Sequence, residues 1–211
     1  MRFMLAVHKY FALPRYVLVH PVDGFYNMKY EKQGHTSIIF INLILFWISY
    51  SFQKQYCGFC VNDSDPLSYN TFKDLAYIVV LFAIWCAGNW SVTTLMNGEG
   101  KLRDIAMAAS ISLTPMIYVF IPAALLSNLL VENEATFYQI VMGISIVWFV
   151  ILMFCGVMTI HNFSVGRTFA ALFLTFLSIC IILFLAIMLA SLLQQVYIFI
   201  KSIYTELLYR A

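Results

Sequence analysis

The chain has 211 residues, of which 63% are hydrophobic and 10% are charged, and its formal net charge is +2. A soluble domain has about 45–50% apolar and about 25% charged residues, so this composition excludes an ordinary soluble fold. The small net charge and the lack of a run of Lys and Arg exclude nucleic acid as a partner. Composition therefore predicts an integral membrane protein.

Residues 1–35 are expected to form an amphipathic segment. Pro21 fits the first turn of a short helix that ends at Gly34, because proline favours helix starts and glycine follows helix ends. The apolar face of this helix contains Val22, Phe25 and Met28. The helix would lie on the membrane surface, with Lys29 and Lys32 near lipid headgroups, or it would pack under the membrane-spanning helices.

Five uncharged stretches are long enough to cross a hydrocarbon core, which takes roughly 20 apolar residues. They are residues 36–52, 75–96, 105–131, 137–160 and 168–193. The predicted fold class is an all-α membrane protein with a bundle of five transmembrane helices within residues 36–200. Apolar residues recur at helical spacing beyond Gln194, so residues 194–211 are expected as an amphipathic tail of an extended last helix.

The distribution of Lys and Arg in the connections predicts the orientation. One side would carry Arg2, Lys9, Arg15, Lys29, Lys32, Lys101, Arg103 and Arg167, and the other Lys54, Lys73, Lys201 and Arg210. The first side is richer in cations, so the N-terminus is expected in the cytoplasm and the C-terminus outside the cell membrane. Residues 1–35 are then cytoplasmic and residues 194–211 extracytoplasmic.

Cys57 and Cys60 lie together in the first outer connection. An oxidising exterior would permit a disulfide between them, and a redox-active pair is the alternative. A thioredoxin-like context around them is lacking.

The end of the second span is unusually polar, with Asn89, Trp90, Thr93 and Thr94 followed by an Asn-Gly-Glu-Gly turn. A buried asparagine needs hydrogen-bond partners, so Asn89 is expected to reach another helix. The cluster is either an interhelical clamp with a tight turn or a site for a partner or ligand.

Pro115 and Pro122 lie seven residues apart in the third span. They would kink that helix twice in a related direction. Such kinks occur in transporters, where freed carbonyls line a cavity, and also in static bundles.

The sequence lacks the residues that membrane enzymes and coupled pumps need. None of the five spans contains an ionisable Asp, Glu, Lys, Arg or His, and no zinc-protease or phosphate-loop motif is present. The histidines lack metal-ligand spacing. We therefore expect no enzyme activity, no cofactor and no metal site.

Four strings resemble, in order, landmarks of the Yip family, membrane proteins named for interaction with Ypt/Rab GTPases. They are HPVDGFY (20–26), NWSVTTLMNGEG (89–100), SLTP (112–115) and HNFSV (161–165). The similarity covers residues from about 14 to 200 and is closest to the bacterial branch. It implies five transmembrane helices, a cytoplasmic N-terminus and a non-enzymatic role in binding other membrane proteins.

The resemblance also bears on partners. Eukaryotic members carry an acidic Asp-Leu-Trp-Gly-Pro-type element before the first span, and the string at 20–26 stands in its place, so a Rab-type GTPase is not the expected partner. Some bacterial relatives are encoded beside carbohydrate ABC importers, which makes the permease subunits of such a transporter candidate partners, besides membrane lipid. The candidate binding or clamping residues are His20, Pro21, Asp23, Gly24, Asn89, Trp90, Thr93, Thr94, Gly98, Glu99, Gly100, His161 and Ser164.

Three functions are consistent with the sequence. The first is a non-enzymatic membrane adaptor or accessory subunit, favoured by the uncharged spans, the two amphipathic ends and the resemblance. The second is a small channel or uncoupled transporter for a neutral solute or lipid, favoured by the prolines and the polar cluster. The third is a thiol-redox protein that uses Cys57 and Cys60.

Overall fold

The structure is a computed structural model that describes residues 12–62 and 70–210. This part of the chain contains helices, turns and loops but no strand. Five helical stretches are long and apolar enough to cross a membrane, which confirms the predicted all-α membrane bundle. The elements are α2 (Pro21–Lys29), α3 (Ser37–Tyr56), η1 (Phe59–Val61), α4 (Thr71–Leu95), α5 (Leu102–Ser112), α6 (Thr114–Ser127), η2 (Glu132–Glu134), α7 (Ala135–His161) and α8 (Val165–Arg210).

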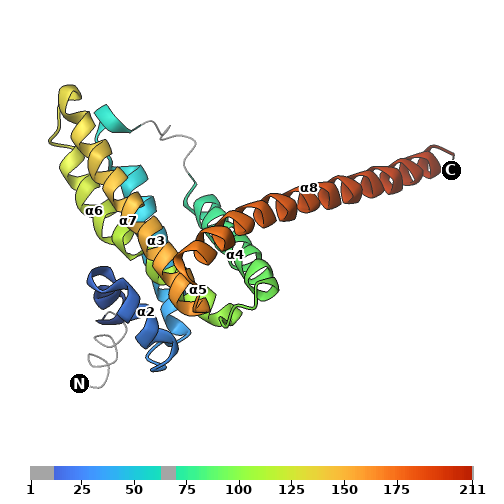
Figure 1. The fold of residues 1–211 in the computed structure, drawn as a ribbon. Coiled ribbons are helices and arrows are strands. Elements are labelled where there is room, and N and C mark those ends of the chain that lie inside the picture. Colours follow the sequence, from blue (N-terminus) through green and yellow to red (C-terminus); the bar gives the residue numbers. More distant parts are fainter. Residues whose placement is uncertain (1–11, 63–69, 211) are drawn as a thin grey trace, which may run out of the picture.

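The bundle is built from α3, α5, α6 and α7, with α4 at its edge. Helices α3 and α7 pack on both α5 and α6, and α6 and α7 lie side by side (Figure 1). Helix α4 packs on α5 and on the first part of α8. The start of α4 is fixed by Asn70, whose side-chain oxygen accepts hydrogen bonds from the backbone N–H groups of Phe72 (3.1 Å) and Lys73 (3.2 Å).

The third span consists of two helices instead of one helix with two kinks. The break lies at Leu113, because Pro115 lacks an N–H and its ring would clash with the carbonyl four residues earlier. The carbonyl of Ser110 near the break accepts a hydrogen bond from Asn42 of α3, at 3.3 Å. Pro122 lies inside α6 without ending it. One break therefore lies next to Pro115, as predicted for one of the two kinks, and a kink at Pro122 stays a prediction.

The N-terminal segment packs under the bundle, which was one of the two predicted alternatives. Residues 12–19 form a short helix before α2. Phe25 and Met28 of α2 are 0% and 1% exposed, and they belong to one core cluster with Leu152 of α7. Gly156 of α7 allows this approach, because a Cβ atom there would lie 3.2 Å from Phe25 Cζ. Residues 1–11 of the predicted segment lie outside the described residues.

The end of α2 differs from the prediction. The helix ends at Lys29, and Lys32 takes a left-handed backbone conformation with φ 54°. Gly34 therefore lies beyond the helix, buried where a Cβ would meet Met28. Val22 is exposed, so only two of the three residues predicted for the apolar face are buried.

Helix α8 is the longest element, with 46 residues, or about 69 Å at 1.5 Å per residue. It leaves the bundle after packing on α4, and its second half stands apart from every other described helix (Figure 1). The predicted fifth span and the predicted tail are parts of this one continuous helix.

Candidate functional site

One end of the bundle collects most of the polar residues that the sequence singled out. We call it the loop face; it comprises the α4–α5 turn (residues 96–101), the α7–α8 turn (residues 162–164) and the C-terminal end of α2. Hydrogen bonds among these three segments and the helix ends next to them join residues that are 61 to 131 positions apart in the chain.

The two turns begin in the same way, with asparagine in the left-handed conformation. Asn97 (φ 57°) follows α4, and Asn162 (φ 53°) follows α7. The N–H of Gly98 donates to the carbonyl of Thr93 at 2.7 Å, and the N–H of Phe163 donates to the carbonyl of Met158 at 3.0 Å. These are Schellman-type helix ends, which satisfy carbonyls that the helix itself leaves free.

His161 joins the two turns. The imidazole is 2% exposed, and its Nδ1 accepts a hydrogen bond from the backbone N–H of Gly100 at 3.3 Å. A Cβ atom would lie 2.4 Å from this Nδ1 at Gly98 and 2.6 Å from the ring Cε1 at Gly100. Both glycines are therefore required by the close approach of the imidazole, and the Asn-Gly-Glu-Gly string is a packing motif around His161.

An ion pair ties α2 to the α4–α5 turn. Lys29 Nζ lies 3.3 Å from Glu99 Oε2 and donates to the carbonyl of Ile160 at 2.6 Å, which caps a free carbonyl at the end of α7. The hydroxyl of Tyr30 donates to Glu99 Oε2 at 3.0 Å. The hydrogen bond from Tyr30, followed by that from Lys29, lowers the pKa of Glu99.

Two arginines add further contacts between segments. Arg167, at the start of α8, donates to the carbonyl of Met96 at 2.7 Å and lies over the ring of Phe163. Arg103, at the start of α5, donates to the carbonyl of Gly34 at 3.3 Å. The loop face is thus held by charged side chains that pair with backbone carbonyls of neighbouring turns.

Asn89 forms the interhelical contact that the sequence suggested. It is 0% exposed, and its Nδ2 lies 3.2 Å from Thr175 Oγ1 of α8. Thr93 is also buried, and its hydroxyl donates to the carbonyl of Asn89 at 2.7 Å. The contact joins α4 to α8 at a point where Asn89 is closed to solvent, as an interhelical clamp requires.

Other candidate residues lie elsewhere or are exposed. Trp90 and Thr94 point outward from α4, and Ser164 is exposed before α8. His20 is exposed and stacks on Tyr16 at 5.0 Å between ring centroids. The other candidate residues in the string at 20–26 are Pro21, which starts α2, Asp23, which is exposed, and Gly24, which packs on Val17.

The proposed disulfide is not formed. Cys57 is buried in a cluster with Ala123 and Tyr138, whereas Cys60 is exposed on η1, and both are free thiols. The two side chains therefore occupy different environments at this end of the bundle, opposite the loop face.

Sequence reasoning missed several residues of the loop face. The sequence predicted lipid headgroups near Lys29, but its partner is Glu99. Arg167 entered only the orientation argument, and no contact was predicted for Tyr30 or, deeper in the bundle, for Thr175. Their partners are distant in sequence, so no local pattern indicates these pairs. Asn162 had a usable signal, because asparagine directly after an apolar helix is a common helix end.

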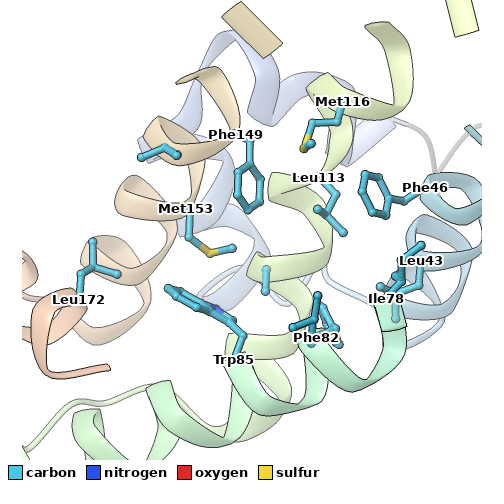
Figure 2. Close-up of a pocket in the computed structure, with 13 residues that line it drawn as sticks. Leu43, Phe46, Ile78, Phe82, Trp85, Leu113, Met116, Phe149, Met153 and Leu172 are labelled. Atoms are coloured by element: carbon cyan, nitrogen blue, oxygen red, sulfur yellow. The ribbon is translucent and has the colours of Figure 1, made fainter. Parts of the chain in front are cut away.

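A separate cavity of about 560 Å³ lies at membrane depth, among α3, α4, the α5–α6 break, α7 and α8 (Figure 2). Phe46, Phe82, Trp85, Phe149 and Met153 are among its lining residues, all of which are apolar or aromatic. Such a lining suits a hydrocarbon ligand and penalises a polar solute.

Comparison with known proteins gives one match. A family model described as the Yip1 domain matches residues 15–188, which includes every element from α2 to α7 and half of α8. No curated protein and no solved structure matches the chain. The chain therefore belongs to the Yip1 domain family of multi-pass membrane proteins.

Proposed function

We propose that this protein is a non-enzymatic membrane adaptor or accessory subunit that binds other integral membrane proteins through its loop face. The observation that carries this proposal is the way the loop face is built. Its polar side chains make contacts within the protein: Lys29 pairs with Glu99, and His161 accepts a hydrogen bond from Gly100. The α4–α5 turn remains exposed while these contacts hold it in place. A rigid exposed turn suits recognition of a partner better than catalysis.

Exposed apolar side chains flank this turn. Leu95, the last residue of α4, is 86% exposed, and Leu102, the first residue of α5, is 48% exposed. Between them, the Glu99 side chain is 53% exposed although it is paired with Lys29. Two apolar residues around a carboxylate on a rigid turn offer a partner both buried area and one directed polar contact.

We place the loop face in the cytoplasm of a cell-membrane protein. Lys29, Lys32, Lys101, Arg103 and Arg167 lie in the segments that form it or adjoin it, whereas Lys54 and Lys73 belong to the opposite end. This asymmetry supports the predicted orientation under the positive-inside rule. The first partner to test is a permease subunit of a carbohydrate ABC importer, a proposal that comes from the family resemblance alone.

A photoreactive residue in place of Leu95 tests the proposal in native membranes. Irradiation, purification in mild detergent and mass spectrometry should recover a membrane protein partner in defined stoichiometry. The matched control is the same residue at Phe59, which is 97% exposed at the opposite end and should not capture that partner. Recovery of the isolated chain alone from both positions would reject an adaptor role for the loop face.

A second candidate is an uncoupled lipid transporter, supported by the apolar cavity beside the break at Leu113. Leu113 and Met116 both line the cavity, so a movement at the break would change its shape. Reconstituted protein would then scramble fluorescent phospholipid in vesicles, and Leu113→Trp, which fills the cavity, would slow scrambling. Absence of scrambling by the folded protein would remove this candidate.

A further inference from the structure

The apolar cavity opens toward lipid between two membrane-spanning helices. Two of its lining residues are exposed, Leu81 of α4 (64%) and Val150 of α7 (55%), so the opening lies between these helices. An apolar cavity stays dry, whereas hydrocarbon chains can enter it from the side. Its volume of about 560 Å³ lies within the range of about 300–1,000 Å³ that is usual for ligand sites. The surroundings therefore supply lipid as the occupant.

A charged pair stands beyond the cavity, at the end of the bundle opposite the loop face. Lys54 Nζ of α3 lies 3.1 Å from Asp74 Oδ1 of α4. Along α4, Asp74 is one turn, or about 6 Å, from Ile78, which lines the cavity (Figure 2). Along α3, Lys54 Nζ lies 5.0 Å from the ring centroid of Tyr50, and this ring stacks on Phe46 of the cavity wall at 6.1 Å between centroids. Both helices thus connect the cavity wall to the charged pair.

The carboxylate of this pair has an acceptor that the described residues do not use. Asp74 is 9% exposed, and its Oδ2 is buried without a hydrogen-bond partner in the part of the chain that the structure describes. Leaving a buried carboxylate oxygen unpaired is unfavourable, so a ligand that brings an N–H donor gains affinity there. The side chain of Lys54 is 30% exposed, which leaves its ammonium within reach of a phosphate. The pair therefore suits a headgroup that carries both a cation and an anion.

The depth of the cavity matches the length of one lipid leaflet. Among the lining residues of α4, Trp85 is the farthest from Asp74, at about 16 Å along the helix (Figure 2). Half of the hydrocarbon core is about 15 Å thick. A lipid whose headgroup lies at the charged pair would therefore extend one acyl chain as far as Trp85.

We propose that the cavity and the Lys54–Asp74 pair together bind one phospholipid with an ethanolamine headgroup. One acyl chain fills the cavity, the phosphate pairs with Lys54, and the primary ammonium donates a hydrogen bond to Asp74 Oδ2. A choline headgroup carries the same charges but has no N–H donor, so it cannot make the last contact. The lipid stays bound, and the proposal rests neither on a partner at the loop face nor on lipid movement.

Native mass spectrometry of the purified full chain tests the site with dioleoyl phosphatidylethanolamine and dioleoyl phosphatidylcholine, which differ only in the headgroup. We expect one ethanolamine lipid per chain, with an affinity about tenfold or more above that for the choline lipid. The double variant Lys54→Gln with Asp74→Asn should lose this preference. The matched control Lys73→Gln, which changes an exposed cation beside the site, should keep it. Equal affinity of the wild type for the two lipids, or binding that does not saturate, would overturn the proposal.

A second measurement locates the acyl chain in the wild-type protein. Phosphatidylethanolamine with a photoreactive diazirine at the end of one acyl chain, added to phosphatidylcholine vesicles, should label peptides that contain residues 78–85 and 149–153. Leu81→Trp places an indole at the opening and should remove most of this labelling, whereas Val80→Trp, at an exposed position outside the cavity, should not. Labelling confined to other helices would show that lipid only surrounds the protein and would overturn the proposal. Specific labelling by a protein that does not scramble lipid would still support it.

Discussion

The loop face and residues 194–210 of α8 are held in place by opposite means. At the loop face, His161, Glu99 and Lys29 fix three segments through short polar contacts between distant parts of the chain. The outer part of α8 stands apart from the other described helices (Figure 1), and the side chains that the structure describes there are exposed. Substitutions that remove contacts at the loop face should therefore lower the stability of the bundle. Substitutions in residues 194–210 of α8 should leave that stability unchanged.

The largest expected effect separates a buried leucine from an exposed one. Leu152→Ala removes a side chain that is 0% exposed in the main core cluster, whereas Leu208→Ala acts on a side chain that is 60% exposed near the end of α8. We expect the first to lower the free energy of unfolding by about 2–5 kcal/mol and the second to stay within about 0.5 kcal/mol. Unfolding by SDS titration in mixed micelles measures both. Equal effects would mean that the two regions are not energetically distinct.

The next effect concerns the glycines around His161. Gly98→Ala forces a Cβ into the imidazole, at a site where the undistorted distance would be 2.4 Å. Overpacking of this kind costs about 1–3 kcal/mol. Gly143→Ala is the control, because a Cβ there meets nothing within 4 Å. A Gly98→Ala protein with wild-type thermal stability would show that His161 does not pack against this turn.

The hydrogen bond between Asn89 of α4 and Thr175 of α8 should contribute a smaller free energy to stability. A double-mutant cycle with Asn89→Ala and Thr175→Val isolates the coupling, which we expect at about 0.6 kcal/mol and no more than about 1.7 kcal/mol. Thr205→Val is a control on the exposed part of α8, where the hydroxyl donates only to the carbonyl of Lys201 in its own helix. A coupling of zero would place Asn89 and Thr175 out of contact in the membrane.

The smallest effect is the pH dependence of the Glu99 ion pair. Because the pKa of Glu99 is lowered in the folded protein, the ionised carboxylate stabilises it. That contribution is present above the ordinary glutamate pKa of about 4.3 and is lost as the pH falls through the lowered folded value. The melting temperature of the wild type should thus exceed that of Glu99→Gln at pH 7, and the difference should shrink below pH 4.3 and in high salt. A difference that is constant with pH would contradict the ion pair with Lys29.

Sequence alone predicted the elements that a bilayer dictates. Charged groups are costly in hydrocarbon, so five uncharged stretches mark five helices, and the positions of Asn89 and of the Asn-Gly-Glu-Gly turn indicated an interhelical contact and a tight turn. The same reasoning predicted kinks at Pro115 and Pro122, and the structure has a break next to Pro115. This break follows from the local chemistry of proline, which removes an N–H and clashes with an earlier carbonyl.

What only the tertiary structure decided is which distant segments meet. The partner of Glu99 is Lys29, and glycine is needed at positions 98 and 100 because the imidazole of His161 packs against them. No spacing rule connects these residues, since they meet only when their segments reach the same end of the bundle. The placement of Phe25 and Met28 under α7, in place of a lipid surface, was likewise open until the helices were assembled. Hydropathy is a property of each segment by itself, whereas close packing and ion pairing depend on relative positions, which the folded bundle alone sets.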